Sequence, residues 1–401
     1  MVTSVKVLLA AGGTGGHITP ALATAQELRQ LNGEAQVVFV GSESVGDEAL
    51  WGVPTARVVR VSRAPMPSRL SVGSVRFPFQ LCSSTVQSGA ILFKEAPDVV
   101  VGFGGYASGP LVFLAALRGI PTLIHEQNVV PGRANRWLSR LVDRIAISFP
   151  ETRQRFGAAA AKTICTGNPI RHHLLETQKA SAYQRFDLQS SRLTLLVVGG
   201  SQGAQAVNRL VAEAVEKMTP QARRQLQIVH LAGAADTPAL QERYASLEIV
   251  ARVFPFLHEI GDAYAVADLV VARAGASTIA ELTCFGLPMV LIPYPYAGGH
   301  QRLNAQIVAR AGAAVMLEQE GLTGERLAAE IVRLMTDAAG RRRMGEGSRR
   351  AGHPDAARRL ATEILTLIEQ RGRKRSGHDG VVEQGRLAGS ERSVSGGAIA
   401  S

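Results

Sequence analysis

The sequence contains few aromatic residues and few cysteines. Aromatic side chains make up only 5% of the 401 residues. This scarcity argues against the stacking platforms that bind single-stranded nucleic acid, and we expect no nucleic-acid partner. The three cysteines, Cys82, Cys165 and Cys284, are odd in number and far apart. They exclude a disulfide framework and indicate buried thiols in a reducing compartment.

Long apolar runs and acidic residues are also scarce. No uninterrupted apolar run reaches the ~18 residues that span a bilayer, and no basic-plus-apolar leader opens the chain. We therefore expect a cytoplasmic protein, soluble or peripheral to a membrane. The 44 Lys and Arg residues outnumber the 33 Asp and Glu residues and give a net charge of +11. By itself such an excess favours an anionic partner, which can be nucleic acid, an acidic membrane or a phosphorylated substrate.

Short apolar runs alternate with helical patterns along the chain. They predict two series of buried parallel strands: 4–11, 36–40, 98–101, 121–125 and 144–148, then 193–198, 226–232, 268–272 and 288–292. The segments VLLAAGGTGGH and LLVVGGSQGAQ both read as strand, glycine turn and helix. The sequence therefore predicts an α/β protein with two Rossmann-like parallel-sheet domains that face a central cleft.

Turn-forming residues between the two series of strands mark the domain boundary. Gly167 and Pro169 interrupt it, so we place the first domain at 1–168 and the second at 169–354. Residues 372–401 are rich in Gly, Ser and charge without an apolar period, and we expect a disordered tail there.

The first glycine loop is a candidate anion site. Four glycines fall between Gly12 and Gly16, and His17 follows at once. A glycine turn between a buried strand and a helix lets backbone N–H groups approach an anion. The spacing matches neither the dinucleotide fingerprint nor a P-loop, so a tight turn without a ligand stays open on spacing alone. The position of His17 at a strand's carboxyl end favours a chemical role.

Polar residues gather at other strand ends. Glu126, Gln127 and Asn128 follow the strand 121–125, where they suit hydroxyl recognition, although Asn128 alone could cap a turn. Arg171 suits phosphate oxygens, and Ser201 opens a second glycine-loop helix.

Further candidates lie late in the second domain. Glu281 follows the strand 268–272 and could accept from ribose hydroxyls or form a helix-face ion pair. Gln301 and Asn304 are three residues apart, hence neighbours on one helix face, and could bind a sugar.

Taken in order, these blocks resemble the MurG family of UDP-N-acetylglucosamine transferases. The matching blocks are GGTGGHITPALA, FGGYASGP, HEQNVVPGRANR, TGNPIR, VVGGSQGAQAVN, ARAGASTIAELTCFGLP and HQRLNA, and they cover about residues 4–370. The resemblance implies the two-domain GT-B fold, with the donor in the second domain and the acceptor in the first. It also implies a helix at about 355–371 that packs back on the first domain.

The resemblance assigns roles residue by residue. It makes His17 the catalytic base. It implies UDP-GlcNAc binding by Thr14, Gly15, Gly16, Asn128, Arg171, Ser201, Leu257, Ala276, Ser277, Thr278, Ile279, Ala280, Glu281, Gln301 and Asn304. Tyr106, Ser108 and Glu126 fall on the acceptor side. Leu257 lies in FPFLHE, the stretch that departs most from the family pattern. The family needs no cofactor and no metal for the chemistry, and this chain has no Asp-x-Asp pair.

The implied activity is an inverting transfer of GlcNAc from UDP-GlcNAc to the C4 hydroxyl of MurNAc in undecaprenyl-pyrophosphoryl-MurNAc-pentapeptide (lipid I), giving lipid II for peptidoglycan. Three alternatives stay open. They are another GT-B UDP-sugar transferase with a lipid or natural-product acceptor, a UDP-sugar epimerase on the same fold, and a nucleotide-binding module without catalysis. The blocks HEQN and FGGYASGP favour the lipid I acceptor over that of another transferase. An epimerase should have extra catalytic carboxylates in the first domain, where only Glu126 stands out. The full set of donor and acceptor motifs argues against a module without catalysis.

A basic stretch predicts contact with a membrane. No acidic residue occurs between Glu48 and Glu95, whereas Arg57, Arg60, Arg63, Arg69, Arg76 and Lys94 are interleaved with apolar residues. A solvated basic face is the alternative interpretation. Because a lipid-linked acceptor requires work at a bilayer, we expect the region 57–94 to bind an anionic membrane surface. The expected location is the cytoplasmic face of the plasma (inner) membrane, as a peripheral protein.

Overall fold

The computed structural model of the chain describes residues 4–12, 15–41, 57–61, 72–105, 108–200, 203–296 and 299–371, with the backbone alone for 72–77. Thr14, Tyr106, Ser201, residues 62–71 of the basic stretch and the tail 372–401 lie outside the described residues.

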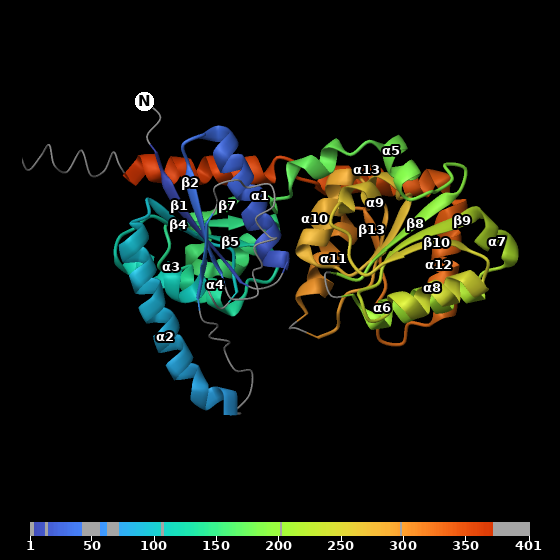
Figure 1. Cartoon of the computed structure of the whole chain (residues 1–401), viewed down its shortest axis with the longest axis horizontal. Coiled ribbons are helices and arrows are strands. Elements are labelled where there is room, and N and C mark those ends of the chain that lie inside the picture. Colours follow the sequence, from blue (N-terminus) through green and yellow to red (C-terminus); the bar gives the residue numbers. More distant parts are fainter. Residues whose placement is uncertain are drawn as a thin grey trace, which may run out of the picture.

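Two parallel sheets form the centres of two domains (Figure 1). The first sheet has the order β3-β2-β1-β4-β5-β6-β7. Its strands are β1 (Lys6–Ala11), β2 (Gln36–Gly41), β3 (Arg57–Arg60), β4 (Val99–Gly102), β5 (Thr122–Glu126), β6 (Arg144–Ile147) and β7 (Thr163–Cys165). Val99, Val100 and Val101 are fully buried, as expected of a central parallel strand that is covered on both faces.

The second sheet repeats this arrangement in the order β10-β9-β8-β11-β12-β13. Its strands are β8 (Leu193–Val198), β9 (Leu226–Leu231), β10 (Val250–Phe254), β11 (Leu269–Ala272), β12 (Met289–Leu291) and β13 (Ala314–Met316). All the predicted apolar runs form strands, and the prediction of two parallel α/β domains is confirmed.

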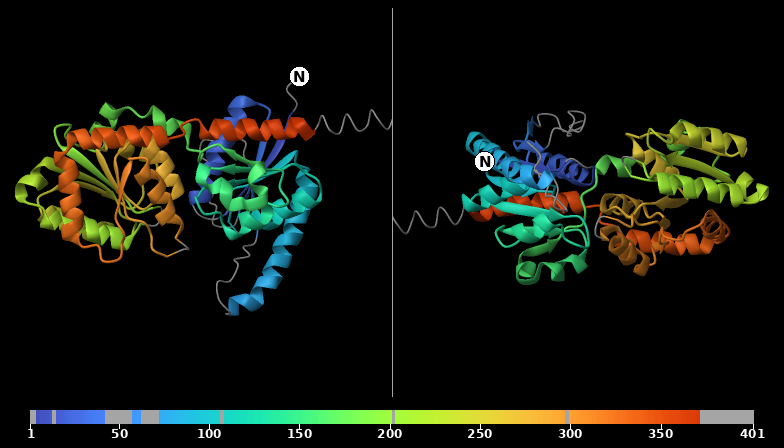
Figure 2. Two further views of the ribbon diagram at one scale, coloured as in Figure 1. Left: turned by 180° about the vertical axis from the view of Figure 1, so that it is seen from behind. Right: turned by 90° about the horizontal axis from the view of Figure 1, so that it is seen from below.

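Helices cover both faces of each sheet (Figures 1 and 2). In the first domain they are α1 (Gly15–Leu31), α2 (Val72–Glu95), α3 (Ser108–Leu117), α4 (Arg133–Leu138) and the 3-10 segment η2 (Pro150–Lys162). The second domain contains η3 (His172–Glu176), α5 (Lys179–Arg185), α6 (Gln205–Lys217), α7 (Pro220–Gln225), α8 (Thr237–Ser246), α9 (Ile260–Val266), α10 (Ala276–Phe285), α11 (His300–Arg310), α12 (Gly324–Thr336) and α13 (Ala338–Ala351).

A helix over residues 356–371 crosses back to the first domain, where it is drawn in red (Figures 1 and 2). Four of its buried residues join the core cluster that also holds residues of β1 and α1: Leu360, Ala361, Ile364 and Leu367. Arg144 Nε lies 3.1 Å from Glu363 Oε1, and Arg371 Nη2 donates to Gly119 O at 2.9 Å. This helix thus stabilises the first domain.

The strand order sets where a ligand can bind. The order reverses direction between β1 and β4 in the first sheet and between β8 and β11 in the second. Loops that leave neighbouring strands at such a switch point diverge and leave a crevice at the carboxyl edge of the sheet. Each sheet therefore presents one crevice, with the start of α1 at the first and the start of α10 at the second.

Candidate functional site

A cavity of about 380 Å³ lies between the two domains, where the two crevices meet. The first domain contributes Gly15, Gly16, His17, Thr19, Gln127 and Asn128. The second domain and its connection contribute Arg171, Val198, Gly200, Leu231, Pro255, Phe256, Leu257, Ile260, Tyr264, Gly275, Ala276, Ser277, Thr278 and Glu281. Two helix N-termini, those of α1 and α10, thus open onto one space, and both favour an anion there.

The β1–α1 and β4–α3 loops pack backbone against backbone beneath His17. Gly12 N donates to Gly104 O at 2.9 Å. Gly105 has φ +84°, and a Cβ at this position would lie 2.4 Å from Gly12 Cα. Glycine is therefore required at position 105 by the close approach of the two loops and by the positive φ.

His17 lines the cavity from the first turn of α1 and is half-buried. Its ring lies over Gly104, where an added Cβ would be 3.1 Å from His17 Nε2. Burial lowers the pKa of His17 below its ordinary value of 6.5. The imidazole is therefore neutral at neutral pH, the form that accepts a proton.

A second histidine, His125, lies fully buried at the end of β5. Its Nε2 is 3.1 Å from Gly167 O, and its Nδ1 is 3.2 Å from the amide Nε2 of Gln127. Because a carbonyl only accepts, Nε2 carries the hydrogen and Nδ1 accepts from Gln127. Burial lowers the pKa of His125 to about 4, so this histidine stays neutral. Gln127 also donates to Phe103 O at 2.8 Å.

Arg171 and Glu281 bring opposite charges to the cavity wall. Arg171 Nε is buried and has no hydrogen-bond partner among the described residues. Tyr264 donates its hydroxyl to Glu281 Oε2 at 2.6 Å, which fixes the carboxylate. Burial raises the pKa of Glu281, and Arg171 acts against that rise. A guanidinium with an unpartnered buried Nε beside two helix starts is suited to a diphosphate.

Hydrogen bonds tie the two domains together at the cavity. Ser277 Oγ lies 3.4 Å from Gly16 O, and Asn168 Nδ2 lies 3.4 Å from Ser277 Oγ. Asn304 Nδ2 donates to Asn128 Oδ1 at 3.0 Å, while Val129 N donates to Asn304 Oδ1 at 3.0 Å. The start of α10 and helix α11 are thereby held against the loops of the first domain.

Some candidate residues lie away from the cavity lining. Asn304 is fully buried and also donates to Ala274 O at 3.2 Å, so its polar atoms already have partners. Gln301 Oε1 accepts from Ala274 N and Tyr294 N at 3.1 and 3.0 Å. Ile279 packs in the core, and Ala280 is not part of the lining.

The acceptor-side candidates that are described hold loops in place. Glu126 is buried and accepts from Asn128 N, Gly132 N and Asn135 Nδ2 at 3.0, 2.9 and 2.8 Å. Burial raises the pKa of this carboxyl. Ser108 begins α3, where its hydroxyl donates to Gly105 O at 2.9 Å. Neither side chain lines the cavity.

Other lining residues carry no signal in the sequence. Tyr264 lies within α9 and orients Glu281 from 17 positions away along the chain. Phe256 has 52% of its surface exposed and forms an apolar wall with Leu257 and Ile260. Leu257 is a candidate from the family resemblance and lines the cavity, whereas no motif marks Tyr264, Phe256 or Ile260, which only the fold brings to the switch point of the second sheet.

Comparison with known proteins places the chain in a family. The glycosyltransferase family 28 N-terminal domain matches residues 7–147, and the family's C-terminal domain matches residues 194–360. A protein of Anaeromyxobacter sp. is 41% identical over 93% of this chain and 97% of its own length. A protein of Thermodesulfovibrio yellowstonii is 37% identical over 91% of this chain and 100% of its own. Both are named UDP-N-acetylglucosamine–N-acetylmuramyl-(pentapeptide) pyrophosphoryl-undecaprenol N-acetylglucosamine transferase.

Solved structures agree with this assignment. The crystal structure of Acinetobacter baumannii MurG matches with a TM-score of 0.70 and 30% identity, over 90% of this chain and 99% of that one. A glycosyltransferase of kitacinnamycin (19% identity, TM-score 0.68, 91% of this chain, 100% of that one) and a Listeria monocytogenes protein titled putative UDP-N-acetylglucosamine 2-epimerase (15%, 0.69, 92%, 98%) share the fold alone. The chain therefore belongs to the MurG family within glycosyltransferase family 28 and has the GT-B fold.

Proposed function

We propose that this chain transfers GlcNAc from UDP-GlcNAc to the C4 hydroxyl of MurNAc in undecaprenyl-pyrophosphoryl-MurNAc-pentapeptide, giving lipid II. The observation that carries the proposal is the cavity between the domains. There, His17 at the start of α1 faces Arg171, Glu281 and the start of α10. A proton acceptor on one side and an anion site on the other are what a glycosyl transfer from a nucleotide sugar requires.

In the proposed reaction the acceptor oxygen attacks the anomeric carbon from the face opposite to UDP. The new C4–O–C1 bond forms as the C1–O bond to the β-phosphate breaks, so the configuration at C1 inverts. His17 takes the hydroxyl proton, and the electron pair of the broken bond leaves on UDP. Arg171 and the N–H groups at the start of α10 stabilise the charge that develops on the diphosphate. Leu257 and its apolar neighbours enclose the uracil.

Release of UDP tests this function. We expect UDP release from UDP-GlcNAc to depend on a lipid I analogue, with a product heavier by one GlcNAc in mass spectrometry. An epimerase would instead convert UDP-GlcNAc to a second UDP-sugar without any acceptor. A binding module would retain UDP-GlcNAc without turnover. Either result would contradict the transferase proposal.

Replacing Glu281 with alanine is expected to weaken donor binding about tenfold or more, because a charge-assisted hydrogen bond contributes ~1.5–3 kcal/mol. A ribose contact made equally in the ground and transition states appears in the donor KM, so kcat should stay close to wild type. Tyr264→Phe, which removes only the hydroxyl that fixes Glu281, should give a smaller change in the same direction. Donor titration by calorimetry measures both variants. An unchanged donor affinity in Glu281→Ala would assign Glu281 a structural role.

We also propose that the enzyme works at the cytoplasmic face of the inner membrane and binds its anionic surface through the region 57–94. Phe79 and Phe93 of α2 have 76% and 85% of their surfaces exposed, and Val86 between them 67%. Lys94 is also exposed, whereas Arg57 pairs with the buried Glu95. No helix in the described part of the chain combines the length and apolar content that crossing a bilayer requires.

Vesicle binding tests this surface. Phe79→Ser/Phe93→Ser is expected to reduce co-sedimentation with anionic vesicles several-fold, because two inserted aromatic side chains are lost. Activity on a soluble acceptor should persist, since neither residue lines the cavity. Wild-type binding should weaken as salt is raised. Equal co-sedimentation of the wild type with neutral and anionic vesicles would contradict an electrostatic contribution.

A further inference from the structure

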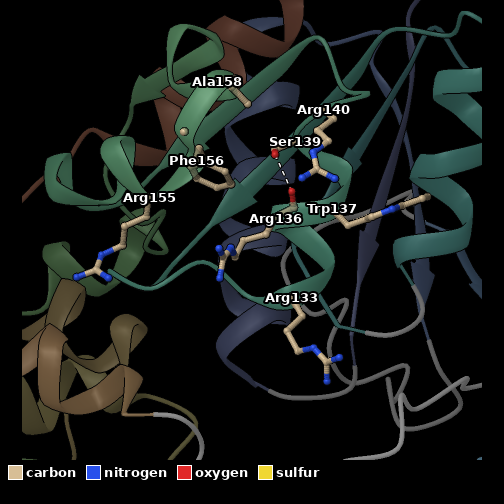
Figure 3. A pocket seen from close by; sticks show the side chains of 10 residues that line it. Arg133, Arg136, Trp137, Ser139, Arg140, Arg155, Phe156 and Ala158 are labelled. Atoms are coloured by element: carbon tan, nitrogen blue, oxygen red, sulfur yellow. Dashed lines mark hydrogen bonds between the residues drawn. The ribbon is translucent and has the colours of Figure 1, made fainter.

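A second cavity, of about 490 Å³, lies in the first domain between α4 and η2. Four arginines line it, three from the α4 region and one from η2 (Figure 3): Arg133, Arg136, Arg140 and Arg155. Trp137 and Phe156 add apolar surface to the wall. The lining, all of it from described residues, contains no acidic side chain.

The charge of this arginine cavity is not neutralised by the described residues around it. None of its four guanidinium groups forms an ion pair or hydrogen bond with them. Other arginines of the same domain do find partners, as Arg144 does with Glu363. Like charges gathered around a hollow repel one another, so an anion that enters it is attracted by all of them. Arginine binds carboxylates and phosphates with two parallel hydrogen bonds.

The arginine cavity is tied to the loop that leads into the central cavity. Thr152 Oγ1 of η2 donates to Asn128 O at 3.2 Å. Gly132 N, just before α4, donates to Glu126 Oε2 at 2.9 Å. Asn128 lines the central cavity and Arg133 lines the arginine cavity. The two positions are five apart along the chain, so their Cα atoms are at most ~18 Å apart.

The acceptor of the proposed reaction carries carboxylates that can extend from the central cavity to the arginine cavity. In N-acetylmuramic acid the peptide is attached through a lactyl group on C3, next to the C4 hydroxyl that reacts. A pentapeptide joined through its amino end has a free carboxylate at the other end and spans up to ~17 Å when extended. The lactyl group and the peptide together thus span a distance comparable to the separation of the two cavities, so a peptide that leaves the reacting sugar can place a carboxylate in the arginine cavity, with its side chains against Trp137 and Phe156.

We propose that the arginine cavity binds the carboxylates of the acceptor's pentapeptide and makes the enzyme selective for an acceptor that carries it. The assignment rests on the proposed function. The alternative occupant is a lipid headgroup phosphate, which has a similar charge. The peptide is favoured because the site is a hollow, and because both of its walls are hydrogen-bonded to the loop 126–132 that enters the central cavity: η2 through Thr152 and α4 through Asn135, whose Nδ2 donates to Glu126 Oε2 at 2.8 Å.

The test compares two soluble short-chain acceptors, one with the pentapeptide and one with the peptide removed. Wild-type kcat/KM should be about tenfold or more higher for the peptide-bearing acceptor, the scale of one charge-assisted pair. In Arg136→Gln/Arg155→Gln that advantage should disappear through a higher acceptor KM, with the donor KM at its wild-type value. Arg153→Gln is the matched control, since Arg153 lies on η2 and does not line the cavity.

Each of the other possible results would contradict a different part of the proposal. Equal wild-type activity on both acceptors, or an equal loss on both in the variant, would overturn the peptide assignment. Intact acceptor selectivity with weaker binding to anionic vesicles would replace the peptide by a lipid headgroup. No GlcNAc transfer to either acceptor by the wild type would overturn the proposed function and this inference with it. Arg133→Gln/Arg140→Gln removes the other half of the cluster and should repeat the loss of selectivity.

Discussion

Replacing His17 with alanine is expected to lower kcat by about 10²-fold or more, the scale of a lost general base. UDP-GlcNAc affinity should stay close to wild type, because the donor contacts of the proposed mechanism come from Arg171, Glu281 and the start of α10. His17→Gln should be as slow as the alanine variant, since an amide can hydrogen-bond but cannot take the proton. Single-turnover kinetics and donor titration separate the two effects.

The pH dependence of turnover provides a second measurement. A protonated imidazole cannot act as a base, so kcat must fall as the pH falls through the pKa of His17. Because burial lowers that pKa, wild-type kcat should remain on its plateau down through pH 6.5 and decline only below it. His172 is the matched control: it is exposed and lies 3.2 Å from Glu176, and His172→Ala should keep the wild-type profile. Near-normal turnover in His17→Ala would mean that another group takes the proton.

The central strands of both sheets could be predicted from the sequence, and the edge strands could not. The four strands without a prediction, β3, β7, β10 and β13, are the outermost strands of the two sheets. A central parallel strand is covered on both faces and reads as a continuous apolar run. An edge strand is only partly covered, as in β3, where Arg57 and Arg60 are both exposed. The apolar signal therefore weakens where the sheet ends.

The parts of the site that lie at strand ends could be predicted for the same reason. His17, Asn128, Ser277 and Glu281 follow central strands, and they line one cavity. Tyr264 and Phe256 reach that cavity through the packing of the second domain, which no local pattern encodes. Asn304 is a candidate from a local pattern that does not line the cavity. Its spacing from Gln301 suggests a sugar-binding face, yet the approach of the two domains buries it against Asn128 and Val129.

Gly105→Ala is expected to damage stability and activity together. The added methyl group would lie 2.4 Å from Gly12 Cα and 2.9 Å from Gly12 N. Neither contact can relax through a side chain, because both atoms are backbone. The positive φ of +84° adds strain for any residue with a Cβ, and such positions cost about 1–3 kcal/mol.

The consequence for activity follows from what these loops support. Separating them would break the hydrogen bond from Gly12 N to Gly104 O and move the surface on which the His17 ring lies. Displacement of a reacting group by about 1 Å can cost 10²-fold in rate, so kcat should fall even at temperatures where Gly105→Ala remains folded.

Gly109→Ala is the matched control, since a Cβ there meets no atom within 4 Å and the residue lies in α3. Alanine is favoured over glycine in a helix, so this control should unfold at the wild-type temperature or slightly above and keep its turnover. Thermal unfolding and kcat measured on the same preparations decide the matter: a Gly105→Ala protein with wild-type values of both would show that the two loops do not need their close backbone contact.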